Sequence, residues 1–210
     1  MEYAKDSKER MPYEHYMEAF QSCNPQEVCD RTGVSYDAEN KSFQLKFMGS
    51  LYNISYPDYE ITHVEDSFAH HPLEEMHSAK ILIARYLTEG SKVLSTGKFL
   101  TYREMPWGEV YFKQFQGRCL MRLAFGFGNK IDKFAKAMEE MNAVKLDKGD
   151  ASYELEFLDG MKLQFILWEG DDEFPPSSQI LFSDNFAISF SAEDRAVIGD
   201  ITIGTLKAYQ

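Results

Sequence analysis

The residues best suited to chemistry form one dense segment, residues 168–178, which we call the acidic loop. Its carboxylates are Glu169, Asp171, Asp172 and Glu173, and they stand among two aromatic residues, a glycine and two prolines. Clustered carboxylates can bind a hard cation such as calcium or magnesium, or a cationic ligand. The calcium-loop spacing D-x-[DN]-x-[DN]-G is absent, so a solvated acidic turn is the alternative. The composition predicts a rigid loop over an apolar surface, a type of loop that often carries function.

Aromatic residues surround an arginine in a second dense segment, residues 101–111. Such groups line ligand pockets or bind anions, and they also occur at ordinary core edges. We expect Tyr102, Arg103 and Trp107 to form one ligand site with Trp168 and the carboxylates of the acidic loop. In that site the two tryptophans would stack on the ligand and Arg103 would pair with an anionic group. The carboxylates would accept hydrogen bonds or bind a cation.

Histidines gather before and within the first turns of the longest predicted helix. His70, His71, Glu74 and His77 are the candidate metal ligands, because Glu74 and His77 fall on one helical face. Di-iron bundles use the spacing Glu-x-x-His twice, on helices that pack together. Its second occurrence here, Glu60-x-x-His63, lies in a segment expected to be extended. Helix capping and favourable charge at a helix N-terminus are the alternative.

The three cysteines indicate neither a disulfide framework nor a zinc site. Cys23, Cys29 and Cys119 are an odd number and form no C-x-x-C pair. Cys119 lies in an apolar run, where a buried structural thiol is expected rather than a low-pKa thiolate beside arginine. The sequence also lacks a P-loop and the patterns G-x-G-x-x-G, G-x-S-x-G and H-E-x-x-H.

Composition bounds the class of protein. The chain has 210 residues, 44% hydrophobic and 14% aromatic, which is enough for one sizeable core. Its net charge of −12 argues against binding nucleic acid. Residues 147–210 hold 13 acids and 4 bases, so this third would favour a cation, a cationic ligand or a basic partner. Solubility is the alternative explanation of that charge.

The N-terminus and the apolar runs indicate where the protein acts. Residues 1–10 are charged and lack the apolar stretch of a signal peptide. No apolar run is long enough to span a bilayer, so we expect no membrane association and a cytoplasmic location. We expect residues 1–11 to be a flexible N-terminal tail and residues 12–210 to form a single domain.

Alternating apolar residues predict two β-hairpins. The first would use a type II′ turn at Gly49-Ser50. The second would use a three-residue loop with Gly160 in the left-handed region, as a bulge requires. These registers oppose Phe47 to Tyr52, Leu45 to Ile54 and Phe43 to Tyr56 in the first hairpin, and Phe157 to Met161, Leu155 to Leu163 and Tyr153 to Phe165 in the second.

Helical patterns fall in blocks between the hairpins. A further strand pair is expected at residues 179–182 and 186–190. Hairpins separated by helices, rather than repeated βαβ units, predict an α+β fold with a mainly antiparallel sheet. The expected helices cover residues 12–22, 25–32, 72–89, 110–125 and 129–141, followed by a last helix that Ser191 caps and that runs towards Ala208.

The segment Trp168-Glu169-Gly170-Asp171-Asp172-Glu173-Phe174-Pro175-Pro176-Ser177, followed by Ile180-Leu181-Phe182, resembles a family motif, WEGDxEFPPS…ILF. The family is an uncharacterised domain of unknown function from anaerobic bacteria and archaea. Tyr102-Arg103-Glu104-Met105-Pro106 with Gly108 is similar to its central motif, and the resemblance covers roughly residues 24–208.

The resemblance brings no catalytic residues with it, because none are established for the family. Some relatives carry an added iron–sulfur segment with four cysteines, which this chain lacks. The family's setting, sometimes near corrinoid or methyl-transfer genes, implies a role in handling a cofactor.

Three classes of function are compatible with these residues. The leading one is a non-catalytic accessory protein of anaerobic metabolism that binds a small molecule or cofactor. The second is a metal-dependent enzyme that uses the clustered carboxylates, with His70, His71 or His77. The third is an acidic interaction module whose binding to a basic partner weakens with salt. The sequence identifies neither the cofactor nor the oligomeric state.

Overall fold

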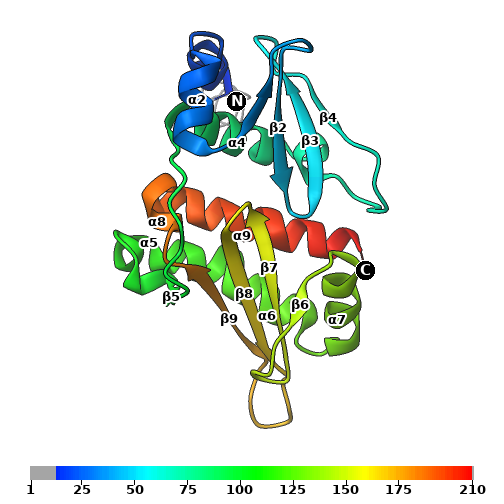
Figure 1. The fold of residues 1–210 in the computed structure, drawn as a ribbon. Coiled ribbons are helices and arrows are strands. Elements are labelled where there is room, and N and C mark those ends of the chain that lie inside the picture. The colour runs from blue at the N-terminus through cyan, green and yellow to red at the C-terminus, as the bar shows by residue number, and fades with distance from the viewer. Residues whose placement is uncertain (1–12, 210) are drawn as a thin grey trace, which may run out of the picture.

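The structure is a computed structural model that describes residues 13–209, so the expected tail, residues 1–11, lies outside the described part. Nine strands form one antiparallel sheet in the order β4-β3-β2-β7-β8-β9-β5, with β1 beside β2 and β6 beside β7 (Figure 1). The α+β fold is therefore confirmed. The strands are β1 (Ser35–Asp37), β2 (Ser42–Phe47), β3 (Ser50–Ser55), β4 (Ile61–His63), β5 (Phe99–Thr101), β6 (Val144–Lys145), β7 (Ala151–Leu158), β8 (Met161–Trp168) and β9 (Ser177–Ser183).

The helices pack against this sheet, and α9 runs between strands β2–β4 and strands β7–β9 (Figure 1). Residues 13–21 are helical, and a 3₁₀ turn, η1, and a π-helical segment, η2, lie among the α-helices. The elements are α2 (Pro25–Thr32), α3 (Pro72–Glu75), α4 (His77–Glu89), η1 (Tyr102–Glu104), α5 (Gly108–Phe115), η2 (Gln116–Met121), α6 (Arg122–Phe127), α7 (Ile131–Glu140), α8 (Phe186–Ser189) and α9 (Ala192–Ala208). Among residues 13–209, no helix is both long and apolar enough to cross a membrane.

The sheet has a narrow joint between β2 and β7. One residue pair, Phe47 with Leu158, connects these strands, and the amide of Met48 donates to the carbonyl of Phe157 at 3.0 Å. Strands β2–β4 with α2 and α4 lie on one side of the joint, and β7–β9 with α5–α7 on the other (Figure 1). The fold therefore consists of an N-terminal half and a C-terminal half around a common core.

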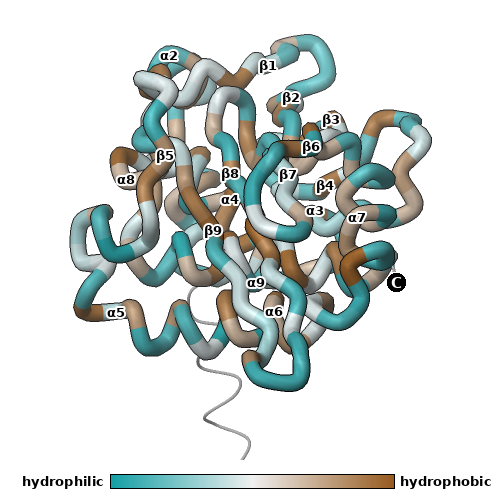
Figure 2. Tube along the Cα trace, turned by 90° about the horizontal axis from the view of Figure 1, so that it is seen from below, coloured by the Kyte–Doolittle hydropathy of each residue, from teal (hydrophilic) through white to brown (hydrophobic). Residues whose placement is uncertain are grey.

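Helix α9 is the central element of that core. Its buried residues, from Ala192 to Leu206, lie on almost every face, as expected for a helix enclosed by other elements. It contacts α4 of the N-terminal half and α5, η2 and α7 of the C-terminal half. Ser191 caps it in the predicted way, since its hydroxyl accepts from the amide of Asp194 and the Asp194 carboxylate accepts from the amide of Ser191. Hydrophilic residues concentrate on the outer loops and turns (Figure 2).

The first hairpin has the predicted faces but a different register. Phe47 pairs with Ser50, and Leu45 pairs with Tyr52, a slip of two residues from the expected pairs. The turn is Met48-Gly49, and both residues have positive φ, 47° and 94°, as a type I′ turn requires. A slip of two preserves which side chains face the core, so alternation alone could not exclude it.

The second hairpin follows the prediction along most of its length. Leu155 pairs with Leu163 and Tyr153 with Phe165, and Gly160 has φ of 76°. Met161 pairs with Leu158 rather than with Phe157, because the irregularity lies before Leu158 instead of within the loop. The left-handed Gly160 and a bulge are therefore as predicted, but the three-residue loop is wrong, because Leu158 belongs to β7 and only Asp159 and Gly160 lie between the strands.

Two other predicted elements are wrong. The helix expected over residues 72–89 is two helices, because Met76 has extended backbone angles, φ −110° and ψ 118°, between α3 and α4. Residues 186–190 form helix α8 and its cap instead of a strand. The rings of Phe186 and Phe190 pack against each other within this turn, with centroids 6.0 Å apart and an angle of 39°. A five-residue segment with four apolar residues fits either periodicity.

Residues 108–127 form one long helical region with a π-helical middle, η2. The extra residue per turn places Cys119 against α9, where its thiol donates to the carbonyl of Ala196 at 3.3 Å. Burial raises the pKa of this thiol to about 12. Cys119 is therefore the buried structural cysteine that its apolar surroundings predicted.

The following helix begins at Ile131 with Lys130 as its cap, one residue later than the cap expected at Asn129.

Candidate functional site

The acidic loop joins β8 to β9 at the end of the sheet furthest from the joint (Figure 1). Asp171 organises it, since one carboxylate oxygen accepts from the amides of Glu173 and Phe174 at 2.8 and 2.7 Å. The amide of Glu169 donates to Asp150 at 2.7 Å. The side chains of all four carboxylates, including Asp172, are exposed, so the loop presents its charge to solvent.

Two glycines allow this loop to pack closely against the end of α6. A Cβ atom on Gly128 would lie 2.2 Å from Cβ of Pro176, and one on Gly170 would lie 2.6 Å from Cδ of Pro176. Neither position has room for a larger residue without displacing the proline. Trp168, at the end of β8, is 40% exposed beside this loop.

The segment at residues 101–111 forms a tight corner between β5 and α5. Thr101 and Glu104 form a capping box around η1. Tyr102 is buried, its ring stacks on Phe115 with centroids 4.0 Å apart, and its hydroxyl donates to the carbonyl of Ala192 at 2.6 Å. Burial raises the pKa of Tyr102 to about 12, and Arg195 lowers it in part. Tyr102 is therefore a buried packing residue beneath the surface of this corner and is not itself exposed to a ligand.

Trp107 is the exposed aromatic residue of this corner. Its φ is 61°, in the left-handed region, and its side chain is 72% exposed. A bulky residue rarely adopts this conformation, and such strain clusters at functional sites. Gly108 makes the corner possible, because a Cβ atom there would lie 1.8 Å from the carbonyl oxygen of Tyr102. The backbone of this corner therefore places the Trp107 side chain at the surface.

Arg103 packs against α5. Its guanidinium lies 3.7 Å from the centroid of the Phe112 ring, and it pairs with Glu109 at 3.5 Å. Neither Arg103 nor Phe112 lines the pocket beside Trp107. The arginine that sequence reasoning selected thus has a local role on α5.

A pocket of about 650 Å³ lies beside Trp107, between α4 of the N-terminal half and α8 and the start of α9 in the C-terminal half. It contains no residue of the acidic loop, so the structure separates the two segments that we expected to form one site. The residues that line it are Arg85, Glu89, Pro106, Trp107, Tyr111, Ala187, Ile188, Ser189, Phe190, Ser191, Ala192, Glu193 and Arg195.

Arg195 is the unusual residue of this pocket, because it is 1% exposed yet carries a charge. Its Nη1 and Nη2 donate to the carbonyls of Phe190 and Pro106 at 2.7 and 2.5 Å, and Nε has no hydrogen-bond partner within residues 13–209. The guanidinium lies 5.7 Å from the centroid of the Tyr102 ring. Burial lowers its pKa, and Tyr102 and Asp194 raise it in part.

The neighbouring acid of α9 is engaged elsewhere. Asp194 accepts from Ser191 and from Nη1 of Arg85 at 2.7 Å, a contact that joins the two halves across the pocket. Within the described residues, no carboxylate makes a hydrogen bond to the Arg195 guanidinium, and buried charges without a paired acid are rare. Sequence reasoning missed Arg195 because nothing in a helical pattern marks one arginine as buried and unpaired.

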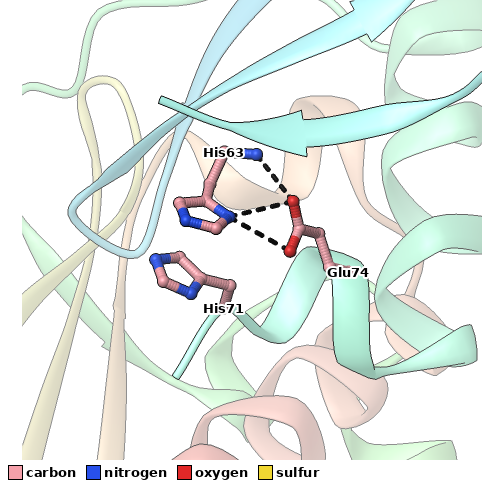
Figure 3. A group of neighbouring side chains, drawn as sticks. All are labelled: His63, His71 and Glu74. Atoms are coloured by element: carbon pink, nitrogen blue, oxygen red, sulfur yellow. Dashed lines mark hydrogen bonds and ion pairs between the residues drawn. The ribbon is translucent and has the colours of Figure 1, made fainter. Parts of the chain in front are cut away.

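A second group of polar side chains lies at the edge of the N-terminal half (Figure 3). His63 of β4, His71 before α3 and Glu74 of α3 offer donor atoms that lie within 4.8 Å of one another. The two imidazole rings stack with centroids 3.6 Å apart and an angle of 16°. The structure therefore brings together two of the four predicted metal ligands, with His63 as a third.

The other two candidates lie outside this group. Nδ1 of His70 is 3.6 Å from Glu75, and its ring packs against Tyr209. His77 packs against the ring of Tyr13, with centroids 5.0 Å apart. The expected helical pairing of Glu74 with His77 does not form the group. The extended reading of the segment around His63 is confirmed, and β4 is what places His63 beside α3.

Comparison with known protein families identifies the family of this chain. A family described as "Domain of unknown function (DUF3786)" matches residues 24–205. The chain belongs to the DUF3786 family. The match covers the DUF3786 domain from α2 to the last turns of α9, so both the pocket and the histidine group lie inside it. No curated protein and no solved structure matches the chain.

Proposed function

We propose that this DUF3786 protein is a non-catalytic binding protein for a small planar anion, held in the pocket between Trp107 and Arg195. The observation that carries the proposal is Arg195, a buried guanidinium with a free Nε and no acid on it within residues 13–209. Two backbone carbonyls and the nearby Asp194 compensate this charge only in part, and an anionic ligand would add to that compensation.

The aromatic residues of the pocket favour a planar ligand. Trp107 is held in solvent by a strained backbone, and Tyr111 lies on the same wall. An indole ring offers a flat apolar face for stacking, and arginine prefers carboxylate or phosphate oxygens. Glu89 and Glu193 also line the pocket, so a singly charged ligand suits it better than a polyanion. An aromatic or heteroaromatic monocarboxylate meets these requirements.

Fluorescence tests the proposal, because the chain has two tryptophans. A Trp168→Phe variant retains Trp107 as the only indole, and benzoate and nicotinate are titrated against the neutral amides benzamide and nicotinamide. We expect saturable quenching by the carboxylates and at least about tenfold weaker binding of the amides, a difference of about 1.4 kcal/mol. Equal effects of acids and amides, or no saturable change, would refute the proposal.

Two arginine variants supply the matched control. Arg195→Met should remove the preference for the carboxylates, because the buried charge is lost. Arg103→Met should leave it within about twofold, since Arg103 lies on Phe112 outside the pocket. Circular dichroism of both variants establishes that each is folded.

The acidic loop supports a second candidate, an interaction surface for a basic partner. Its carboxylates are exposed, and Asp171 is occupied in holding the turn. Binding of this kind would weaken steeply between low and physiological salt and would not require the pocket. A role in anaerobic metabolism, which the family resemblance implies, is part of either proposal.

A further inference from the structure

The group of His63, His71 and Glu74 has the composition of a transition-metal site. Imidazole nitrogen suits zinc, iron, nickel and copper, whereas calcium and magnesium prefer oxygen ligands alone. Two histidines and one carboxylate leave at least one coordination position for water or a substrate. This group lies on β4 and α3, and none of its residues lines the pocket at Trp107.

The distance between His63 and Glu74 fits a shared ion. Nδ1 of His63 lies 3.0 and 3.1 Å from the two carboxylate oxygens of Glu74 (Figure 3). Two donor atoms at about 2.0–2.1 Å from one zinc ion stand roughly 2.9–3.4 Å apart for angles between octahedral and tetrahedral. An ion can therefore replace the proton between these two groups with little movement of either one.

Further contacts hold the donors in place. The backbone amide of His63 donates to Oε1 of Glu74 at 2.6 Å, which anchors the carboxylate at the end of β4. Nε2 of His71 lies 3.1 Å from Asp66, and the amide of Phe68 donates to the same Asp66 oxygen at 2.9 Å. Carboxylates that orient histidines in this way are typical of the second layer around bound metals.

The charge of the group also favours a cation. Glu74 lies 3.0 Å from Nδ1 of His63, and Asp66 lies 3.1 Å from Nε2 of His71. Two carboxylates therefore stand beside two imidazoles that are neutral when they bind a metal.

Tyr52 provides an independent observation beneath the group. Its side chain is fully buried, its ring lies edge-on to His71 at 6.4 Å, and its hydroxyl has no hydrogen-bond partner of good geometry within residues 13–209. A buried hydroxyl without a well-formed hydrogen bond is uncommon, and this one belongs to the residue whose ring contacts His71.

We propose that His63, His71 and Glu74 bind one divalent first-row transition-metal ion, with Asp66 orienting His71. The lone pair of an imidazole nitrogen lies in the ring plane, so rings stacked at 16° cannot both point at one ion. Because Nε2 of His71 faces Asp66, Nδ1 is the atom left for the ion, and the ring must tilt out of the stack to present it. The inference is independent of the proposed ligand in the Trp107 pocket.

Competition with a chromophoric chelator tests the site on the full chain without an affinity tag, with Zn²⁺ as the probe. We expect one equivalent of Zn²⁺ to bind, with affinity at least 100-fold lower in His63→Ala and His71→Ala and 10- to 100-fold lower in Glu74→Gln. The control is His70→Ala, an adjacent histidine outside the group, which should stay within about threefold.

Co²⁺ provides a second readout, because its visible absorption reports nitrogen and oxygen coordination directly. Wild-type protein without stoichiometric Zn²⁺ binding would overturn the proposal, as would a His63→Ala variant that binds as tightly as wild type. A loss in His70→Ala equal to that in His63→Ala would also overturn it. His63 and Glu74 are partly exposed, so these variants should remain folded, and circular dichroism checks that they do.

Discussion

Replacing Trp107 with glycine and with alanine should reverse the usual order of stability for these two residues. Glycine is ordinarily less stable than alanine by about 0.5–1 kcal/mol, because the unfolded chain gains freedom. At φ of 61° alanine retains the left-handed strain, about 1–2 kcal/mol, and glycine removes it. We therefore expect Trp107→Gly to be more stable than Trp107→Ala by about 0.5–1 kcal/mol.

The loss of the indole itself should be modest in both variants. The side chain is 72% exposed, so it buries about 70 Å² of the roughly 250 Å² of a tryptophan. At about 25 cal/mol per Å² this burial is worth about 1.8 kcal/mol. With the relief of strain, Trp107→Gly should lose only about 1 kcal/mol relative to wild type. Phe115→Ala, in the core beneath the same corner, should lose about 3–5 kcal/mol.

Urea unfolding followed by circular dichroism measures all three variants, since the signal does not depend on tryptophan. If Trp107→Ala proves the more stable of the pair, the backbone of Trp107 is not strained. If Trp107→Gly loses 3 kcal/mol or more, the indole belongs to the core and is not held out for a ligand. Either result would remove the structural basis for placing the ligand at Trp107.

Three further predictions concern the core, the thiols and the pH dependence of stability. Gly199→Ala should lower the free energy of unfolding in urea by about 1–3 kcal/mol, because its Cβ would lie 2.8 Å from Sγ of Cys119. Adding Cys119→Ala should recover part of that loss, and strictly additive changes in unfolding free energy would contradict the contact. Cys119 should be the last of the three cysteines to react with a thiol reagent at pH 8 in the native protein, since burial raises its pKa to about 12, and early labelling of Cys119 by mass spectrometry would count against its burial. Hydrogen bonds from His63 lower the pKa of the Glu74 carboxylate, so the stability that it contributes is present above an unfolded pKa of about 4.3 and is lost as pH falls through its lower folded pKa. Glu74→Gln should therefore flatten the decline in unfolding free energy below about pH 4.5. An unchanged slope would argue against the hydrogen bonds between Glu74 and His63.

Local signals in the sequence were enough for the elements with distinctive turn or cap residues. Gly160 set the pairing of Leu155 with Leu163, and the caps at Asn24 and Ser191 marked the starts of α2 and α9. The first hairpin could not be fixed in the same way, because Met48 adopts positive φ without being a residue that signals it. The turn propensities of the residues do not predict a turn that tertiary packing selects.

The candidate sites depend on contacts that no local pattern contains. Arg195 and Trp107 meet across 88 positions of sequence, and His63 reaches Glu74 because β4 pairs at the sheet edge beside α3. Residue density did single out the acidic loop and the corner at Trp107, but density cannot show that one carries its charge in solvent and the other lines a pocket. Arg195 is buried and has no paired carboxylate within the described residues, whereas Arg103 is exposed and pairs with Glu109, and residue type shows neither difference.

The single pairing of Phe47 with Leu158 has a mechanical consequence. Within the sheet the two halves share only this pair, so the sheet bends more easily there than within either half, and the Arg85–Asp194 contact and the packing of α9 resist that bending. The wall of the pocket is divided between the two halves. Arg85 and Glu89 belong to one half and Trp107 to the other, so flexing at the joint would change the width of the pocket. A ligand that contacts both walls would restrict flexing at the joint. The amide of Met48, which lies at the joint, would then exchange more slowly with solvent deuterium.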